Sequence, residues 1–370
     1  MYLNDFNVNI YYYRIKILIS DKNYLNDNDN IIKFETKIMS MRREWYIIEQ
    51  NIYDELKEML DRVMKKKQEL DKKRPLSYAA LQRIKEELYI EWNHHSNAIE
   101  GNTLSLNETR IVLNDGIAIG GKSLREHLEI IGHNDAIKFI EGLANPKYVL
   151  NGKDILEVHN IIMLPVYKDI AGRLRNGAVR ISGTNFIPPA AHKVQELFDD
   201  MVYQIVSLSN ELNPIFLAAL FHHRLVWIHP FFDGNGRVAR LIMNLILMSK
   251  GFPPAIILKE DRKKYYDALN KANNGHYEKF FQLIIQSVER SLNIYLSTTS
   301  ITYDYQPIIN IVKEPEVPYG SEYVSLLARQ GKIDAHKEGK VWYTTKDAIL
   351  DYIEHRKKER KLKPKKSSKK

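Results

Sequence analysis

The sequence has 370 residues and a formal net charge of +9. Because it contains no cysteine, disulfide bonds and thiolate metal sites are excluded, and we expect a cytoplasmic protein. The charge is concentrated in residues 355–370, where ten Lys or Arg stand against one Glu, so the rest of the chain is formally neutral. The apolar run Leu241–Met248 is far shorter than the roughly 20 residues of a spanning helix, so we expect no membrane partner.

The N-terminal part divides into two segments. Residues 1–42 show no clear helical or strand period, and no structure is assigned to them. Residues 43–120 are predicted to form N-terminal helices, because apolar residues recur every three or four positions from Glu44 to Arg74. A second helix is predicted from Ser77 to about Ile90.

A short polar segment follows these helices. Ser96 and Glu100 are four residues apart, so a helix here presents both on one face, and Gly101 is its natural end. Ser105 and Glu108 then have the spacing of a capping box, which predicts the start of another helix. By themselves these residues also fit a solvated surface helix.

Residues 121–300 are predicted to form a helical core. Breaks are expected near Gly132 and Gly152. The segments with helical periodicity are 123–165, Val194–Leu212, Asp261–Asn273 and His276–Leu296. A buried helix is also predicted on each side of residues 229–236, over Pro214–Ile228 and Arg237–Lys250.

One hairpin interrupts the helical pattern. Gly172–Gly183 contains Asn176-Gly177 between alternating segments, which is typical of a two-residue hairpin turn. Val179, Ile181 and Gly183 lie on its second half. A single hairpin can also be mere decoration of a helical domain.

The loop between the two buried helices is the most chemically dense part of the chain. Gly234 and Gly236 let successive N–H groups converge on an anion at a helix N-terminus. Arg237 and Arg240 are three residues apart and can reach one polyphosphate together. Asp233 offers the oxygen ligand that a phosphate-bound Mg²⁺ needs.

His229 completes this loop, since it is the nearby side chain able to accept a proton near neutral pH. The run from His229 to Arg240 matches in full the H-x-F-x-D/E-G-N-G-R-x-x-R signature, and it resembles the Fic family in this respect. The resemblance implies an all-α Fic fold and transfer of AMP from Mg·ATP to a Ser, Thr or Tyr hydroxyl of a target protein.

The same resemblance implies a role for each motif residue. His229 deprotonates the target hydroxyl, Asp233 holds Mg²⁺, and Phe231 anchors the loop in the core. The nucleotide-binding residues implied by the resemblance are Gly234, Asn235, Gly236, Arg237 and Arg240, the last on the γ-phosphate.

Two further segments take on roles once the family is considered. Ser96–Gly101 resembles the S/T-x-x-x-E-G/N inhibitory motif, which implies that Glu100 pairs with Arg240. The hairpin followed by Pro188-Pro189 resembles the family's flap, whose main chain aligns the target. The side chains that either border the adenine or belong to the core are Tyr265, Tyr266 and Tyr277.

Residues 301–355 resemble part of a small winged helix of the excisionase type. A Pro-containing linker, a helix over Ser321–Gln330, a wing turned at Glu338-Gly339 and a last helix from Thr345 to about His355 are predicted. The basic tail, residues 356–370, either binds nucleic acid or is a solvated terminus.

Three other functions remain open at this stage. A Fic protein can remove AMP instead of adding it, or transfer a different nucleotide. A DNA-binding regulator with a nucleotide-sensing core is the alternative from another class, although sensing needs no base at His229. The AMP-transfer interpretation also allows self-modification, and both a monomer and a homo-oligomer are compatible with the sequence.

Overall fold

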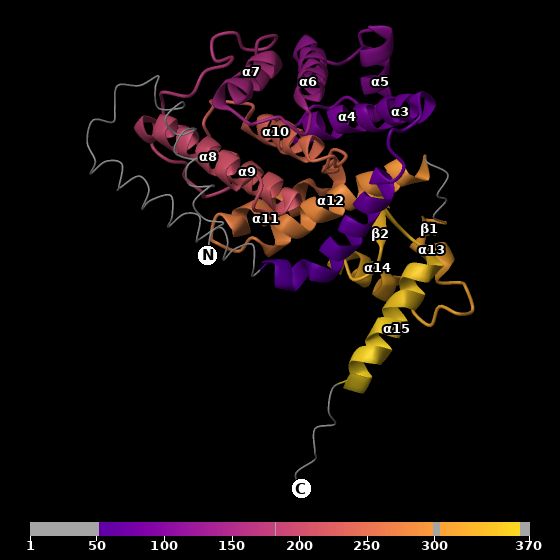
Figure 1. The fold of residues 1–370 in the computed structure, drawn as a ribbon. Coiled ribbons are helices and arrows are strands. Elements are labelled where there is room, and N and C mark those ends of the chain that lie inside the picture. The colour runs from indigo at the N-terminus through magenta and orange to yellow at the C-terminus, as the bar shows by residue number, and fades with distance from the viewer. Residues whose placement is uncertain (1–51, 182, 299–303, 363–370) are drawn as a thin grey trace, which may run out of the picture. The chain divides into compact units, whose positions relative to one another are not determined.

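The computed structural model describes residues 52–181, 183–298 and 304–362. The chain divides into two units, 1–48 and 49–370. The first unit, the expected helix start at residues 44–51 and the end of the basic tail lie outside the described residues. The described part is mostly helical with one small sheet near the C-terminus, as Figure 1 shows, which confirms the predicted all-α class.

Of the two predicted N-terminal helices, the first ends three residues before the expected Arg74 and the second is longer than predicted. Residues 52–71 are helical, and α3 (Tyr78–Ile84), a π-helical turn η1 (Lys85–Tyr89) and α4 (Ile90–Ile99) then form one continuous run. The expected end near Ile90 is therefore wrong, since no glycine or proline interrupts the sequence before Gly101. Gly101 does end the run, with φ of 103°.

The next three helices begin at recognisable caps. The capping box of Ser105 opens α5 (Leu106–Asp115), and a second box at Ser123 opens α6 (Leu124–Leu143). Asn151 caps α7 (Gly152–Met163), as expected for a break near Gly152. Gly132, however, lies inside α6 and is no break.

Gly132 lies at a close contact between two helices. A Cβ at this position would lie 3.1 Å from the carbonyl oxygen of Ile161 in α7. That separation is tighter than most Cβ contacts, so a larger residue would push α6 and α7 apart by a few tenths of an ångström. The glycine therefore marks a close approach of helices, which sequence periodicity alone does not distinguish from a helix end.

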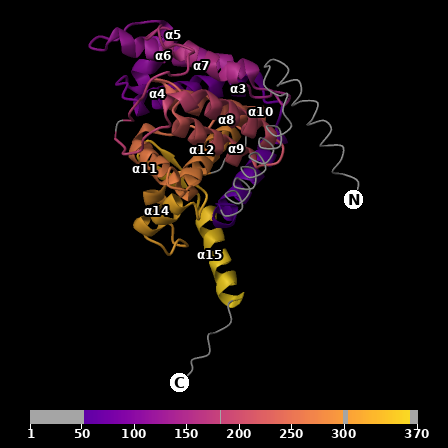
Figure 2. The same cartoon turned by 90° about the vertical axis from the view of Figure 1, so that its left-hand side faces the viewer.

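The centre of the described unit is the helix α10 (Asn235–Ser249). It packs against α9 (Pro214–Ile228), α4, α6 and α7, and both views place it among these helices (Figures 1 and 2). The bounds of α9 match the prediction because Asn213 caps it and Pro214 occupies its first turn. Most side chains of α10 are buried on all faces.

The remaining core helices surround this pair. They are α8 (Val194–Leu208) after the short turn η2 (Ala191–Lys193), α11 (Arg262–Ala272) after η3 (Lys259–Asp261), and α12 (Glu278–Ser297). Their bounds agree with the predicted helices to within a few residues. Helix α8 ends four residues before the predicted end at Leu212.

The predicted hairpin at Gly172–Gly183 is not present as paired strands in the described residues, which omit only residue 182 here. A two-residue hairpin turn of the expected kind needs positive φ at Asn176 and Gly177, and neither residue has it. The backbone N–H of Arg175 instead donates to the carbonyl of Pro230, 2.8 Å away. The backbone of the segment is therefore bonded to the loop after α9 in place of the paired strands that were predicted.

The C-terminal module has more structure than predicted. The expected linker contains a short strand β1 (Gln306–Pro307) and a helix α13 (Ile308–Ile311), before α14 (Ser321–Gln330), whose bounds match the prediction. The wing is formed by β2 (Ala335–Glu338) and β3 (Val341–Thr344), in the antiparallel order β1-β3-β2. Helix α15 (Lys346–Leu362) is capped by Thr345 as predicted, but continues beyond His355.

The module contacts the helical core through its wing. Arg290 of α12 donates to the carbonyl of Lys337 at 2.9 Å, and the Lys337 ammonium lies 2.6 Å from Asp261. No helix of the described residues has the length and apolar character needed to cross a membrane.

Candidate functional site

The loop between α9 and α10 begins at a strained residue. His229 ends α9 with φ of 51° and ψ of 59°, the left-handed conformation, and it is the one non-glycine residue with positive φ among those described. Such a conformation costs on the order of 1 kcal/mol or more and persists where the surroundings impose it. Gly234, with φ of 79°, then turns the chain into α10.

A network of buried groups holds this loop. The side-chain amide of Asn235 accepts from the N–H of Phe231 and donates to its carbonyl, each at 2.9 Å. Phe231 is fully buried and stacks on His159 at a centroid distance of 3.8 Å. His159 accepts at Nδ1 from the N–H of Gly172, so its Nε2 carries the proton and donates to the carbonyl of Asp233, 3.1 Å away.

The imidazole of His229 is oriented by its own helix. Its Nδ1 lies 3.3 Å from the carbonyl oxygen of Val226. A carbonyl only accepts, so Nδ1 carries the proton and the lone pair of Nε2 is free to take another. Burial lowers the pKa of His229 below its ordinary value, and the nearby Arg175 guanidinium lowers it further. The ring is therefore neutral at neutral pH, as a general base must be.

Arg175 ties the neighbouring segment to this loop. It is 3% exposed, and its guanidinium donates to the carbonyls of His229 at 2.7 Å, Gly177 at 2.9 Å and Pro189 at 2.6 Å. One side chain thus joins the loop after α9 to the middle of the segment predicted as a flap and to the proline pair that follows it. Sequence reasoning missed this residue.

The predicted flap residues differ in exposure. Val179 and Ile181 are half-buried, and Gly183 is exposed with φ of 79°. The hydroxyl of Thr184 donates to Asn270 of α11 at 2.8 Å, which fixes the far end of the segment.

The start of α10 offers unused donors. The first amides of a helix, here those of Asn235, Gly236 and Arg237, have no acceptor within it. The Arg237 guanidinium is 4% exposed, and within the described residues its Nε has no hydrogen-bond partner. Its nearest carboxylates, on Glu129 and Asp233, are 3.8 and 3.6 Å away, beyond hydrogen-bond length. The first amides of α10 and the Arg237 guanidinium can therefore bind a polyanion in this buried position.

Asp233 lies beside these donors with its carboxylate half-exposed. Oδ1 accepts from the N–H of Gly234 at 2.6 Å, and Oδ2 is 3.9 Å from the guanidinium of Arg125. The described residues contain no group of three acidic or histidine side chains able to hold a metal by themselves. A single carboxylate fits Mg²⁺ that takes its other ligands from nucleotide phosphates and water.

The predicted pair of Glu100 and Arg240 is formed. Arg240 is 3% exposed and donates through NH2 to Glu100 Oε1 at 2.7 Å and to the carbonyl of Ser96 at 2.8 Å, while its Nε donates to Ser96 Oγ at 3.0 Å. A Cβ on Gly236 would collide with the same Glu100 carboxylate. An anion of the protein itself therefore lies against the start of α10.

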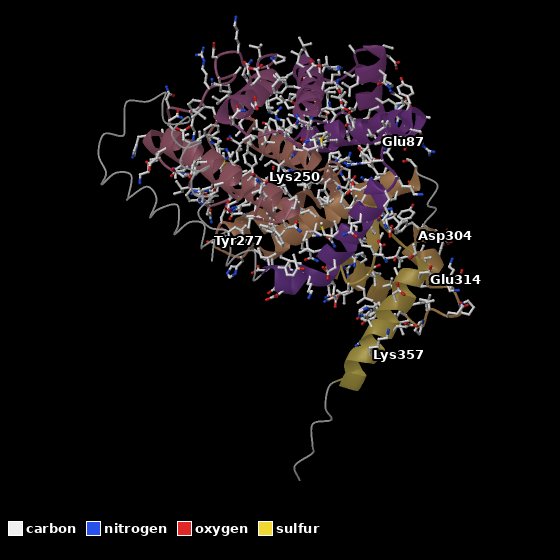
Figure 3. All side chains as sticks on the ribbon, viewed as in Figure 1. Glu87, Lys250, Tyr277, Asp304, Glu314 and Lys357 are labelled. Atoms are coloured by element: carbon white, nitrogen blue, oxygen red, sulfur yellow. The ribbon has the colours of Figure 1, made fainter. Side chains whose placement is uncertain are left out.

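The three tyrosines fall into two groups. Tyr265 is buried, donates toward His222 at 3.1 Å and accepts from Arg240 at 3.4 Å, so it belongs to the core. Tyr277, labelled in Figure 3, packs edge-on against His223 at 5.1 Å. Only Tyr266 borders the site, with its hydroxyl 3.5 Å from Glu100 Oε2.

Comparison with known proteins agrees with this geometry. A sequence model of the Fic/DOC family matches residues 149–247. A relative from Nematostella vectensis, a protein adenylyltransferase Fic, is 39% identical over 246 residues, which is 66% of this chain and 57% of the relative. A relative of the same name from Drosophila grimshawi is 42% identical over 223 residues, 60% of this chain and 46% of the relative.

Solved structures of Fic proteins are also similar to this chain, and the match covers a larger share of their length. Fic-1 from C. elegans is 33% identical, with a TM-score of 0.61, and the match covers 74% of this chain and 78% of that one. The chain belongs to the Fic/DOC family. A Fic-domain signalling protein from Bacteroides thetaiotaomicron is 26% identical with a TM-score of 0.60, covering 65% and 97%. The chain spans about half the length of the curated Fic relatives it matches.

Proposed function

We propose that the protein transfers AMP from Mg·ATP to a hydroxyl side chain of a target protein. The observation that carries this proposal is the free Nε2 of His229 beside a helix start whose Arg237 is buried and short of partners. A base and a phosphate cradle at one place suit attack of a hydroxyl on a phosphate. The name of the curated relatives, protein adenylyltransferase Fic, supports the same activity.

Each residue has a definite part in the proposed reaction. Nε2 of His229 takes the proton from the Ser, Thr or Tyr hydroxyl of the target as that oxygen attacks the α-phosphate. The amides of Asn235, Gly236 and Arg237, with the guanidinium of Arg237, hold the phosphates, and Asp233 would hold Mg²⁺. Gly234 supplies the turn that brings these amides together. The bound Mg²⁺ would neutralise charge on the phosphates. The bond from the α-phosphate to pyrophosphate breaks, and AMP stays on the target.

We also propose that Glu100 restrains this reaction. Its carboxylate takes a donor from Arg240, which in this scheme holds the γ-phosphate, and it lies against Gly236. ATP must then bind with its phosphates displaced, and the α-phosphate is poorly aligned for in-line attack. Ser96, bonded to the same arginine, belongs to this inhibitory group.

The segment 172–189 is proposed to present the target, with Val179, Ile181 and Gly183 along its edge. Its backbone is held at both ends by Arg175 and Thr184 rather than by strand pairing. Main-chain groups left without a partner in the segment would pair with an extended stretch of the target.

Labelling with α-³²P ATP tests the proposed function. The parent protein and its Glu100→Gly variant are incubated with Mg·ATP and cell lysate, and labelled bands are identified. Protein bands that appear with the α-label and not with a γ-label support AMP transfer, and a label on the enzyme itself shows self-modification. Bands that carry only the γ-label would indicate a different reaction.

Removal of AMP is the second candidate activity, favoured by the partly exposed carboxylate of Glu100 in the site. In that case Glu100 would position a water for attack on modified protein. The Glu100→Gly variant then loses release of AMP from a labelled target, whereas an inhibitory Glu100 predicts faster labelling.

Nucleic-acid binding through the C-terminal module is a separate proposal. It is motivated by the basic end of α15, where Lys357 lies (Figure 3), and by the Lys-rich residues that follow. Titrating duplex DNA at rising salt, with and without residues 355–370, tests it. The salt dependence should be shallower for the shortened protein, because that protein neutralises fewer phosphates. Identical curves for the two proteins would contradict the proposal.

A further inference from the structure

His133 of α6 lies behind the inhibitory pair and takes part in the same chain of hydrogen bonds. The imidazole is fully buried, and its Nε2 is 2.9 Å from Ser96 Oγ. Ser96 Oγ in turn accepts from Arg240 Nε at 3.0 Å. One turn before Ser96, the side-chain amide of Asn93 donates to the carbonyl of Ile130 at 2.9 Å, so α4 and α6 are pinned together here.

The direction of each hydrogen in this chain follows from the chemistry of the groups. A guanidinium only donates, so the oxygen of Ser96 accepts from Arg240. The hydroxyl hydrogen of Ser96 then needs an acceptor, and His133 Nε2 is the one that the described residues provide. The other tautomer would leave both the Ser96 hydrogen and His133 Nδ1 without a partner, whereas this one leaves only Nδ1.

Charge keeps His133 an acceptor. Burial lowers its pKa well below the ordinary value, and the guanidinium groups of Arg240 and Arg237 lower it further. A protonated imidazole would have no lone pair for the Ser96 hydroxyl and would add a third positive charge to the buried site. The neutral ring therefore fixes the hydroxyl rotor of Ser96, with its lone pairs toward Arg240.

We propose that His133 is a positioning residue for Arg240, acting through the hydroxyl of Ser96. The Arg240 guanidinium donates to Glu100, to Tyr265 and twice to Ser96, once to its hydroxyl and once to its carbonyl. When Glu100 is absent, the two shorter hydrogen bonds to Ser96 and the longer one to Tyr265 hold the guanidinium in place for a phosphate. This inference rests on the proposed function, in which Arg240 holds the γ-phosphate of ATP.

The test measures affinity for Mg·ATP by calorimetry in the Glu100→Gly background, where no carboxylate competes for Arg240. His133→Leu removes the acceptor, and we expect the Kd to rise roughly 2- to 13-fold, which corresponds to about 0.5–1.5 kcal/mol for one hydrogen bond. His133→Gln places an amide oxygen near the position of Nε2 and should restore the parent affinity. His133→Asn is too short to reach and should behave like His133→Leu.

Coupling to Ser96 separates positioning from general loss of packing. Ser96→Ala should raise the Kd by a similar factor, and His133→Leu added to it should have no further effect. The control is His127→Leu, also a buried histidine of α6, which bonds to the N–H of Ile119 and to the carbonyl of Ser123 and not to Ser96. It should leave the Kd unchanged even where it lowers the melting temperature.

Two results would overturn the assignment of His133. One is an unchanged Kd in both His133→Leu and His133→Asn. The other is an effect of His133→Leu that is equally large with and without the Ser96 hydroxyl. If His133→Leu does not fold, the comparison of Gln with Asn decides alone. Failure of AMP transfer in every variant contradicts the proposed function instead, because the calorimetric Kd does not depend on turnover.

Discussion

At His229 the backbone conformation and a side-chain hydrogen bond together fix the position of the imidazole ring. The left-handed conformation turns the chain directly after α9, and the bond from Nδ1 to the carbonyl of Val226 holds the ring within its own last turn. The free Nε2 therefore belongs to a rigid element. Strain at this one residue is held by its surroundings, since Arg175 bonds the His229 carbonyl and Asn235 closes the loop beyond it.

Replacing His229 by Ala should abolish AMP transfer and leave Mg·ATP binding within about twofold, because the base acts on the target hydroxyl and not on the phosphates. Initial rates with α-labelled ATP and a calorimetric Kd measure the two effects. The exposed His276 supplies the control, His276→Ala, which should change neither. Transfer by His229→Ala at the parent rate would refute the mechanism.

The same residue gives a pH dependence. The pKa of His229 is lowered from its ordinary 6.5, so the neutral, active form persists as the pH falls from 8 to 6.5. Turnover under saturating substrate should therefore be flat over that range and decline only at lower pH. A rate that already halves at pH 6.5 or above would show that the ring titrates normally.

Glu100→Gly should raise transfer by about one to two orders of magnitude, because a charge-assisted hydrogen bond of about 1.5–3 kcal/mol is removed from the restrained state. Glu100→Asp should give a smaller increase, since the aspartate side chain is one methylene shorter and holds Arg240 less well. Initial rates at saturating Mg·ATP compare the three proteins. If Glu100→Gly is no faster than the parent, the pair with Arg240 is structural and does not restrain the enzyme.

At the scale of elements, caps and flanking proline or glycine residues located several helix ends, although Gly132 was wrongly predicted as a break. The cap at Asn213 with Pro214 set the start of α9, and Gly101 ended α4. The hairpin predicted at 172–183 was wrong because this segment forms hydrogen bonds with residues far along the chain. Arg175 donates to the carbonyl of His229, 54 positions later, and a turn dipeptide such as Asn-Gly does not predict such a contact.

The supporting residues of the site were missed for a related reason. His159 and His133 lie on mostly apolar faces of α7 and α6, which periodicity assigned to scaffold. A histidine on such a face is a weak signal that a buried polar group nearby needs a partner. The motif loop itself was readable because its residues are contiguous.

Arg175→Met should separate target handling from nucleotide binding. It leaves the carbonyls of His229, Gly177 and Pro189 without their shared donor, so the segment 172–189 loses its fixed position. Labelling of a protein target should fall about ten- to hundredfold in kcat/KM, while the Kd for Mg·ATP changes little. The exposed Arg173 gives a matched control, Arg173→Met, and equal rates for the two variants would argue against this role.

At the scale of the whole described unit, one buried carboxylate joins three distant segments. Glu289 of α12 accepts from Arg62 at 2.9 Å and from Lys66 at 2.9 Å, both in the helix 52–71. Lys66 also reaches Asp334, before the wing, at 2.6 Å. Arg62 and Lys66 are more than 200 positions from Glu289 and Asp334, so periodicity and local motifs could not predict this pairing. The cluster links the C-terminal module to the core.

Glu289→Gln tests how much this cluster stabilises the fold. Glu289 is 1% exposed, and removing its charge takes the carboxylate away from Arg62 and leaves the buried Lys66 paired with Asp334 but no longer with Glu289. Loss of one partner from a buried ion pair typically costs about 3–5 kcal/mol. Urea unfolding at pH 7 measures the loss. The control is Glu58→Gln, which breaks an exposed pair with Lys332 at 3.7 Å between the same helix and the module and should cost less than about 1 kcal/mol.

The pH dependence of that difference identifies the carboxylate as its source. Burial alone would raise the pKa of Glu289, but Arg62 and Lys66 outweigh it and lower the pKa from 4.5 to about 2. A lowered folded-state pKa gives stability that is fully present above about pH 4.5 and is lost as the pH falls toward 2, about 3 kcal/mol in all. The gap between parent and Glu289→Gln should therefore be constant from pH 8 to about 5 and narrow steadily below that. A gap that is unchanged at pH 3.5 would mean that Glu289 acts through packing and not through its charge.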